Sequence, residues 1–205
     1  MQKHAALLVV DIQADFCPGG ALAVADGDAI VPLVNRLAAK FQTVVITQDW
    51  HPANHASFAA NHPGKTPFET IAMPYGPQIL WPTHCVMGTP GAALHPDLTT
   101  TSASLIIRKG SHAGVDSYSA FLEADRTTRT GLNGYFDARG VTDIYLCGLA
   151  LDYCVAWSAE DARHFGFTAT IIEDACRAID LNGSLDQAWT RLLSAGVTRL
   201  AASDL

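Results

Sequence analysis

Residues 5–11 read AALLVVD, which is six apolar residues followed by an aspartate. Short runs rich in Val, Leu and Ile are typical of strands that are buried on both faces. Three later runs, at 44–47, 105–107 and 144–147, have the same character. Because helix-like segments lie between most of these runs, the pattern predicts an α/β fold with a doubly wound, mostly parallel sheet.

The predicted sheet has about six strands. Right-handed connections between parallel strands place helices on both faces of such a sheet. The strands are expected at 5–10, 43–48, 104–108, 142–148 and 168–173, with a weaker one at 197–201. The helices are expected at 27–41, 131–139, 153–165 and 184–195.

Four of the apolar runs lead to a side chain that can take part in chemistry. Asp11 follows the first run, Asp49 and His51 follow the second, and Lys109 follows the third. Cys154 comes shortly after the fourth. Since the carboxyl ends of parallel strands meet at one edge of a sheet, where ligands bind, we expect these residues to converge on one crevice.

Composition narrows the class of protein. The 205 residues suit a single domain spanning residues 1–205. The net charge of -7, without a basic stripe, argues against nucleic acid or an anionic membrane as partner. The first apolar run is too short for a signal peptide or a membrane span. An odd number of cysteines without CxxC spacing predicts free thiols in the cytoplasm. The oligomeric state stays open, a homo-oligomer included.

One long segment, residues 50–98, breaks the alternation of strands and helices. It contains eight prolines, four glycines and five histidines, with little periodicity. A long irregular segment inside a compact domain is usually either functional or disordered. Its aromatic residues argue against disorder, so we expect an ordered excursion over the active site.

Cys154 is the candidate nucleophile. If Asp152 is the N-cap, Cys154 lies in the first turn of the next helix, where free N–H groups and the helix dipole favour a thiolate. The alternative is a buried, inert thiol, the common fate of a free cysteine. That alternative suits Cys147 and Cys176 better, because both lie within or near apolar runs.

A cysteine nucleophile needs a proton acceptor. Asp11 and Lys109 are candidates for a triad with Cys154, because both are expected at strand ends. In such a triad the carboxylate removes the thiol proton, the ammonium stabilises the anions, and the acid protonates a leaving amine. Taken singly, Asp11 could be a turn residue and Lys109 a solvated lysine.

Asp49 and His51 stand two residues apart, so both side chains point to one side of an extended segment. His84 could supply a third ligand. Two histidines and one carboxylate suit Zn, Fe or Mn. His55 and His62 are also within reach in sequence, and histidines often serve local hydrogen bonds instead, so spacing alone does not settle the ligands.

Several motifs together resemble the bacterial nicotinamidases, which belong to the isochorismatase-like hydrolases. The resemblance extends from about residue 5 to about residue 176, and the motifs occur in the same order. They are VDIQADF at 10–16, TQDWHP at 47–52, WPTHCV at 81–86, RKG at 108–110 with DSYSAF at 116–121, and GLALDYCV at 148–155.

The resemblance implies a catalytic triad of Asp11, Lys109 and Cys154. It also implies a cis peptide between Leu149 and Ala150, with the backbone N–H groups of Ala150 and Cys154 forming an oxyanion hole.

The resemblance further implies one divalent metal ion, Zn, Fe or Mn, held by Asp49, His51 and His84, with waters or a fourth side chain completing the shell. In this family the pyridine nitrogen of the substrate meets that ion. The ring-packing positions of the family match Phe16 and Trp81, and Tyr118 lies near the same pocket. Core packing is the alternative role for these aromatic residues.

The activity expected from the resemblance is hydrolysis of nicotinamide to nicotinic acid and ammonia through a thioester. A pocket shaped for a pyridine ring should also admit pyrazinamide. One alternative is a related amidase acting on a carbamoyl or ureido substrate, but such relatives generally lack the metal ligands. The other alternative is a non-catalytic metal- or ligand-binding module.

Overall fold

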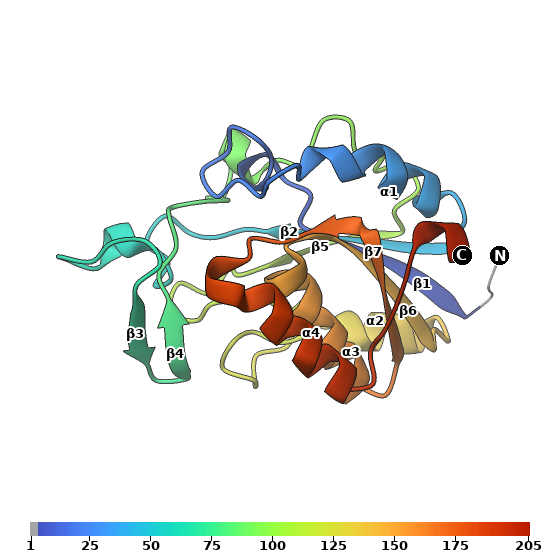
Figure 1. Cartoon of the computed structure of the whole chain (residues 1–205). Coiled ribbons are helices and arrows are strands. Elements are labelled where there is room, and N and C mark those ends of the chain that lie inside the picture. The colour runs from blue at the N-terminus through green and yellow to red at the C-terminus, as the bar shows by residue number, and fades with distance from the viewer. Residues whose placement is uncertain (1–3) are drawn as a thin grey trace.

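A parallel sheet forms the centre of the computed structural model, which describes residues 4–205. Its six strands lie in the order β5-β2-β1-β6-β7-β8, and every pairing between them is parallel (Figure 1). The predicted doubly wound sheet is therefore confirmed, the weak last strand included. The strands are β1 (Ala5–Val10), β2 (Thr43–Asp49), β5 (Leu105–Lys109), β6 (Asp143–Leu149), β7 (Thr168–Arg177) and β8 (Thr198–Leu200).

Helices cover both faces of this sheet. Figure 1 shows α1 on one face, with α3 and α4 side by side on the other. Both faces of β1 are consequently buried over its whole length, which explains why its sequence shows no alternation of polar and apolar residues. The helices are α1 (Val31–Ala38), α2 (Leu132–Ala138), α3 (Ala156–His164) and α4 (Ser184–Ser194).

The helices are shorter than the apolar patterns that predicted them. Pro32 lies in the first turn of α1, where a missing N–H costs nothing, and the residues before it form a short 3-10 turn, Asp28–Ile30. A π-helical turn, Leu151–Val155, precedes α3. No helix within residues 4–205 has both the length and the apolar character needed to cross a membrane.

The irregular segment between β2 and β5 contains two strands that the sequence analysis did not predict. They are β3 (Thr70–Met73) and β4 (Gly76–Ile79), which pair only with each other, in antiparallel fashion. Figure 1 shows this hairpin standing beside the main sheet. Each strand has four residues, and Pro77 interrupts the second, so neither gives a recognisable strand pattern.

Candidate active site

The ends of three neighbouring strands bring together an ammonium and two carboxylates. Asp49 and Lys109 are the last residues of β2 and β5 and lie opposite each other in the register of that pair. Asp11 follows the adjacent strand β1, and its backbone N–H donates to the hydroxyl of Thr47 over 3.0 Å. The same hydroxyl donates to Oδ1 of Asp11 over 2.5 Å. The parallel sheet therefore fixes all these side chains at one edge.

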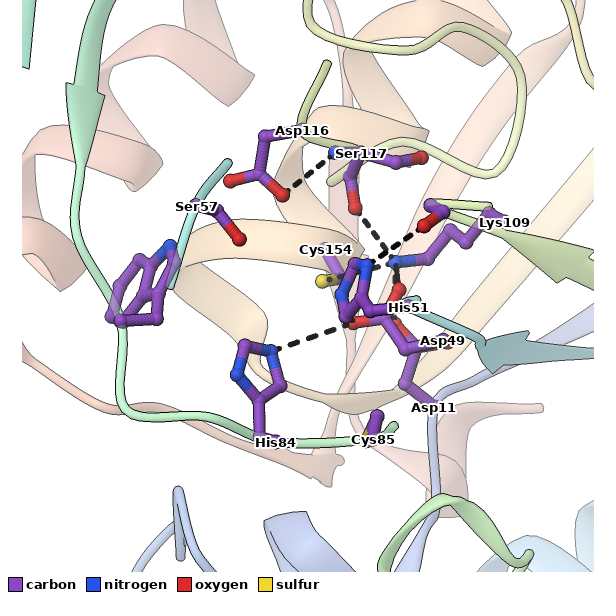
Figure 2. Close-up of polar contacts among 12 residues, drawn as sticks. Asp11, Asp49, His51, Ser57, His84, Cys85, Lys109, Asp116, Ser117 and Cys154 are labelled. Atoms are coloured by element: carbon purple, nitrogen blue, oxygen red, sulfur yellow. Dashed lines mark hydrogen bonds and ion pairs between the residues drawn. The ribbon is translucent and has the colours of Figure 1, made fainter. Parts of the chain in front are cut away.

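Lys109 is the centre of this cluster, with only 2% of its surface exposed. Its ammonium lies 2.9 Å from Oδ2 of Asp11, donates to Oδ1 of Asp49, and donates to the Ser117 carbonyl over 3.0 Å. Sγ of Cys154 lies 3.5 Å from the same nitrogen (Figure 2). Burial alone would lower the pKa of Lys109, but the two carboxylates raise it well above its ordinary value.

We call Asp11, Lys109 and Cys154 the triad. Sγ of Cys154 and the carboxylate oxygens of Asp11 and Asp49 lie within 4.8 Å of one another. Burial raises the pKa of Asp11, although the charge of Lys109 works in the opposite direction. A carboxylate whose pKa is raised is a stronger base, which suits a group that must take the thiol proton.

Burial and charge act in opposite directions on the Cys154 thiol. Burial raises the pKa of this thiol well above its ordinary value, and the nearby Lys109 opposes that effect. The helix-start reasoning omitted desolvation, which penalises a buried anion. The thiolate character of Cys154 stays a prediction.

The predicted N-cap role of Asp152 is wrong. Ala150 occupies the N-cap position, and Cys154 lies in the π-helical turn. The carboxylate of Asp152 points to the start of α4 and the segment before it, where three donors satisfy it. These donors are the backbone N–H groups of Ile179 and Asp180 and the hydroxyl of Ser184.

The peptide bond between Leu149 and Ala150 is cis, as the resemblance implied. Ala150 and Cys154 line one pocket together. An oxyanion hole formed by their backbone N–H groups stays a prediction.

A second cluster, which we call the ligand set, consists of Asp49, His51 and His84. One donor atom from each residue lies within 4.8 Å of the others. Nε2 of His51 is 3.4 Å from Oδ2 of Asp49, and Nε2 of His84 is 4.0 Å from it. Both Nδ1 atoms face carbonyl oxygens, of Gly110 at 2.9 Å and of Pro82 at 2.7 Å.

A carbonyl oxygen can only accept, so Nδ1 must carry the proton in both rings and the Nε2 lone pairs face Asp49. Backbone carbonyls that hold the outer nitrogen in this way are typical of metal-binding histidines. Burial lowers the pKa of His84 to about 4, which keeps that ring neutral. Burial opposes ionisation of Asp49, but the ammonium of Lys109 holds its pKa well below the ordinary value. This donor set fits a divalent ion such as zinc.

The two other candidate histidines are engaged elsewhere. Nδ1 of His55 lies 2.7 Å from the hydroxyl of Ser57, and its Nε2 lies 3.1 Å from the carbonyl of Val115. Nε2 of His62 lies 2.7 Å from the carbonyl of Ala56. Neither histidine belongs to the ligand set, so the geometry favours His84 as the third candidate ligand.

Cys154 and the ligand set line one pocket, and Asp11 and Lys109 are buried beside Cys154. Phe16, Trp81 and Tyr118 line this pocket, as the sequence analysis expected of the substrate site. The indole N–H of Trp81 donates to the hydroxyl of Tyr118 over 3.0 Å. The pocket therefore combines a nucleophile, a set of metal ligands and aromatic walls.

The sequence profile of the isochorismatase domain matches residues 5–203. The chain belongs to the isochorismatase family. Among relatives, it is 57% identical over 203 residues to a nicotinamidase of Acinetobacter baylyi, covering 99% of this chain and 95% of that protein.

Two solved structures support the same relationship. The chain superimposes on a nicotinamidase/pyrazinamidase of Acinetobacter baumanii with a TM-score of 0.98 and 59% identity, covering 100% of this chain and 99% of that one. It also matches a pyrazinamidase of Pyrococcus horikoshii in complex with zinc, with a TM-score of 0.78 and 35% identity over 97% of this chain and 99% of that one.

Five residues that line this isochorismatase-family pocket were not predicted as site residues. They are Leu22, Asp116, Ser117, Tyr153 and Ile179. The ring of Tyr153 packs edge-to-face on Trp81 with 5.0 Å between ring centroids. Asp116 and Ser117 come from an irregular segment whose side-chain directions no periodicity fixes. Their only sequence signal was their position beside Tyr118 in a family motif.

Gly110 gives one testable prediction about the ligand set. A Cβ atom at this position would overlap Cε1 of His51 and lie 2.5 Å from Nδ1, and its backbone has a φ of +71°. Gly110→Ala should therefore displace the His51 ring and weaken zinc binding by about 10-fold or more. Zinc affinity can be measured by competition with a chromogenic chelator.

Gly114→Ala is the matched control, because a Cβ there meets no atom within 4 Å. Equal zinc affinities of the two variants would show that the His51 ring does not depend on this close approach.

Proposed function

We propose that this protein is a cysteine amidohydrolase that converts nicotinamide to nicotinic acid and ammonia. The observation that carries the proposal is that Cys154, with Asp11 and Lys109 buried beside it, shares one aromatic pocket with the ligand set. The high identity to nicotinamidases over almost the whole chain supports the same substrate. A non-catalytic binding module would have no need of a buried lysine held between two carboxylates beside a thiol.

The proposed reaction begins with proton transfer from Cys154 to Asp11 as the substrate enters. Sγ then attacks the carboxamide carbon, while Lys109 stabilises the charge that remains on the triad. Backbone N–H groups of Ala150 and Cys154 donate to the oxygen of the tetrahedral intermediate. Asp11 gives its proton to the amide nitrogen, ammonia leaves, and a thioester remains.

Water completes the cycle. Asp11, again a carboxylate, takes a proton from a water molecule, and the resulting hydroxide attacks the thioester carbon. The carbon–sulfur bond breaks, nicotinic acid forms, and Asp11 returns the proton to the Cys154 sulfur. The sum is one amide and one water consumed for one acid and one ammonia formed.

The ligand set would hold one divalent ion, and Zn, Fe and Mn all suit two imidazoles and a carboxylate. When bound, such an ion would supply a Lewis acid for the ring nitrogen of the substrate. Phe16, Trp81 and Tyr118 would enclose the ring, and a pyrazine should fit where a pyridine fits. We therefore expect pyrazinamide to be a second substrate.

We also propose that residues 1–205 work as one domain in the cytoplasm, with the segment 50–98 covering the active site. The five free cysteines support a reducing compartment. The net charge of -7 supports a small-molecule substrate without a nucleic-acid or membrane partner.

Product analysis tests the proposed function. Purified protein supplied with zinc should release ammonia and nicotinic acid from nicotinamide in equal amounts, and should release much less ammonia from an N-carbamoyl amino acid. Ammonia can be measured with a coupled dehydrogenase and nicotinic acid by chromatography. Preferential release from the carbamoyl compound would instead favour the related amidases of this fold.

A further inference from the structure

Gln78 is the one side chain of the β3–β4 hairpin that is fully buried, with 1% of its surface exposed. The other residues of the two strands are partly or fully exposed. Since the hairpin pairs with no strand of the main sheet, side-chain contacts decide how it is attached. The hydrogen bonds of Gln78 therefore show to which residues the hairpin is attached.

The amide of Gln78 reaches two residues of the pocket wall. Its Nε2 lies 2.6 Å from Oδ2 of Asp116, 2.6 Å from the carbonyl oxygen of Ile79 and 3.3 Å from the hydroxyl of Tyr118, so three acceptors share its two hydrogens. Its Oε1 accepts from the hydroxyl of Tyr75, on the same hairpin, over 3.1 Å. The bond to a buried carboxylate is charge-assisted and is the strongest of these.

The chain of hydrogen bonds continues into the wall itself. The hydroxyl of Tyr118 accepts from the indole of Trp81 over 3.0 Å, and Oδ1 of Asp116 accepts from the backbone N–H of Ser117 over 2.9 Å. Trp81, Tyr118 and Asp116 line the pocket, whereas Gln78 stands behind them. Figure 2 shows the carboxylate of Asp116 across the pocket from His84.

We propose that Gln78 is a positioning residue for the reaction, which holds Tyr118, Trp81 and Asp116 in the arrangement that grips the substrate ring. This inference rests on the proposed function. Without the Gln78 amide, a buried carboxylate and a buried hydroxyl lose a partner and the wall can relax. The triad should be unaffected, because other bonds hold Lys109. Loss of Gln78 therefore weakens ring binding more than it slows the chemical step.

Gln78→Leu is the first test. KM for nicotinamide should rise by about 10-fold, the change expected from losing one charge-assisted hydrogen bond at about 1.4 kcal/mol per tenfold, while kcat stays within about 3-fold. Tyr75→Phe is the matched control, because it removes only the outer bond to Oε1. It should leave KM within about 2-fold of the wild-type value.

A charge swap tests the Gln78–Asp116 pair directly. Gln78→Glu sets two carboxylates against each other and should raise KM more than Gln78→Leu does. Adding Asp116→Asn gives a pair with the carboxylate at position 78 and the amide at position 116. This double variant should bring KM most of the way back to the wild-type value. A purely structural role would not predict this rescue. A double variant no better than Gln78→Glu alone would overturn the proposal.

Alkylation of Cys154 gives a readout that does not need turnover. Iodoacetamide should modify Gln78→Leu at close to the wild-type rate, since the triad is intact, whereas half-protection should require about 10-fold more nicotinic acid. Unchanged protection would overturn the inference. A wild-type protein protected by nicotinic acid but unable to hydrolyse nicotinamide would contradict the proposed function alone.

Discussion

Replacing Cys154 with alanine is expected to lower nicotinamide hydrolysis by at least about 10⁴-fold, because no other group in the pocket can form the thioester. Cys154→Ser should lose most of the activity as well, since a hydroxyl of much higher pKa is poorly activated by Asp11. The fold should survive both changes, which alter one atom or one small group. Ammonia release and thermal unfolding measure the two effects.

The covalent intermediate can be detected directly. Turnover mixtures quenched in acid should carry a nicotinoyl adduct on the peptide that contains Cys154, and iodoacetamide should label that peptide only when nicotinic acid is absent. Cys176→Ala is the control, because Cys176 is buried and does not line the pocket. If Cys154→Ala hydrolysed nicotinamide at the wild-type rate, water would have to attack the amide directly.

The second large effect is expected at Asp11. Asp11→Asn keeps the shape of a fully buried side chain but removes the proton acceptor, so turnover should fall by about 10³- to 10⁴-fold. Asp186→Asn, which neutralises an exposed carboxylate on α4, should leave turnover unchanged.

The triad should also behave as a unit. Lys109→Ala should cripple turnover on its own, and combining it with Asp11→Asn should cost little beyond the worse single variant. Strictly multiplicative losses would show that the two residues act independently. Thermal unfolding should accompany these measurements, because Lys109→Ala leaves two buried carboxylates without their ammonium.

The fold was predictable because its strands are buried on both faces. A run such as residues 5–10 has apolar side chains on both faces of its strand, so it is stable only in a sheet that is covered on both sides. A parallel sheet also places the carboxyl ends of its strands at one edge. That geometry predicted that Asp11, Asp49 and Lys109 would meet. Adding His84 to Asp49 and His51 needed the resemblance to nicotinamidases, since spacing also allowed other histidines.

The unpredicted features share a physical cause. Asp116 lies in an irregular segment, Tyr153 in a π-helical turn and Gln78 in a four-residue strand without a recognisable pattern, so tertiary contacts direct their side chains. The N-cap error at Asp152 arose from treating the helix in isolation. The carboxylate of Asp152 instead accepts hydrogen bonds from Ile179, Asp180 and Ser184. The same reasoning left out burial, which raises the pKa of the Cys154 thiol against the effect of Lys109.

The position of the hairpin-bearing segment has an evolutionary consequence. Asp11 and Lys109 belong to the frame of the sheet, whereas Trp81 and His84 belong to one continuous stretch of chain inserted between β2 and β5. Loops accept insertions and replacement far more readily than buried strands do. A descendant can therefore exchange that single stretch, losing the two histidines of the ligand set and one ring contact together, and still inherit the nucleophile with its lysine and carboxylate. The residues that bind the ring can therefore change in evolution independently of the residues that carry out acyl transfer.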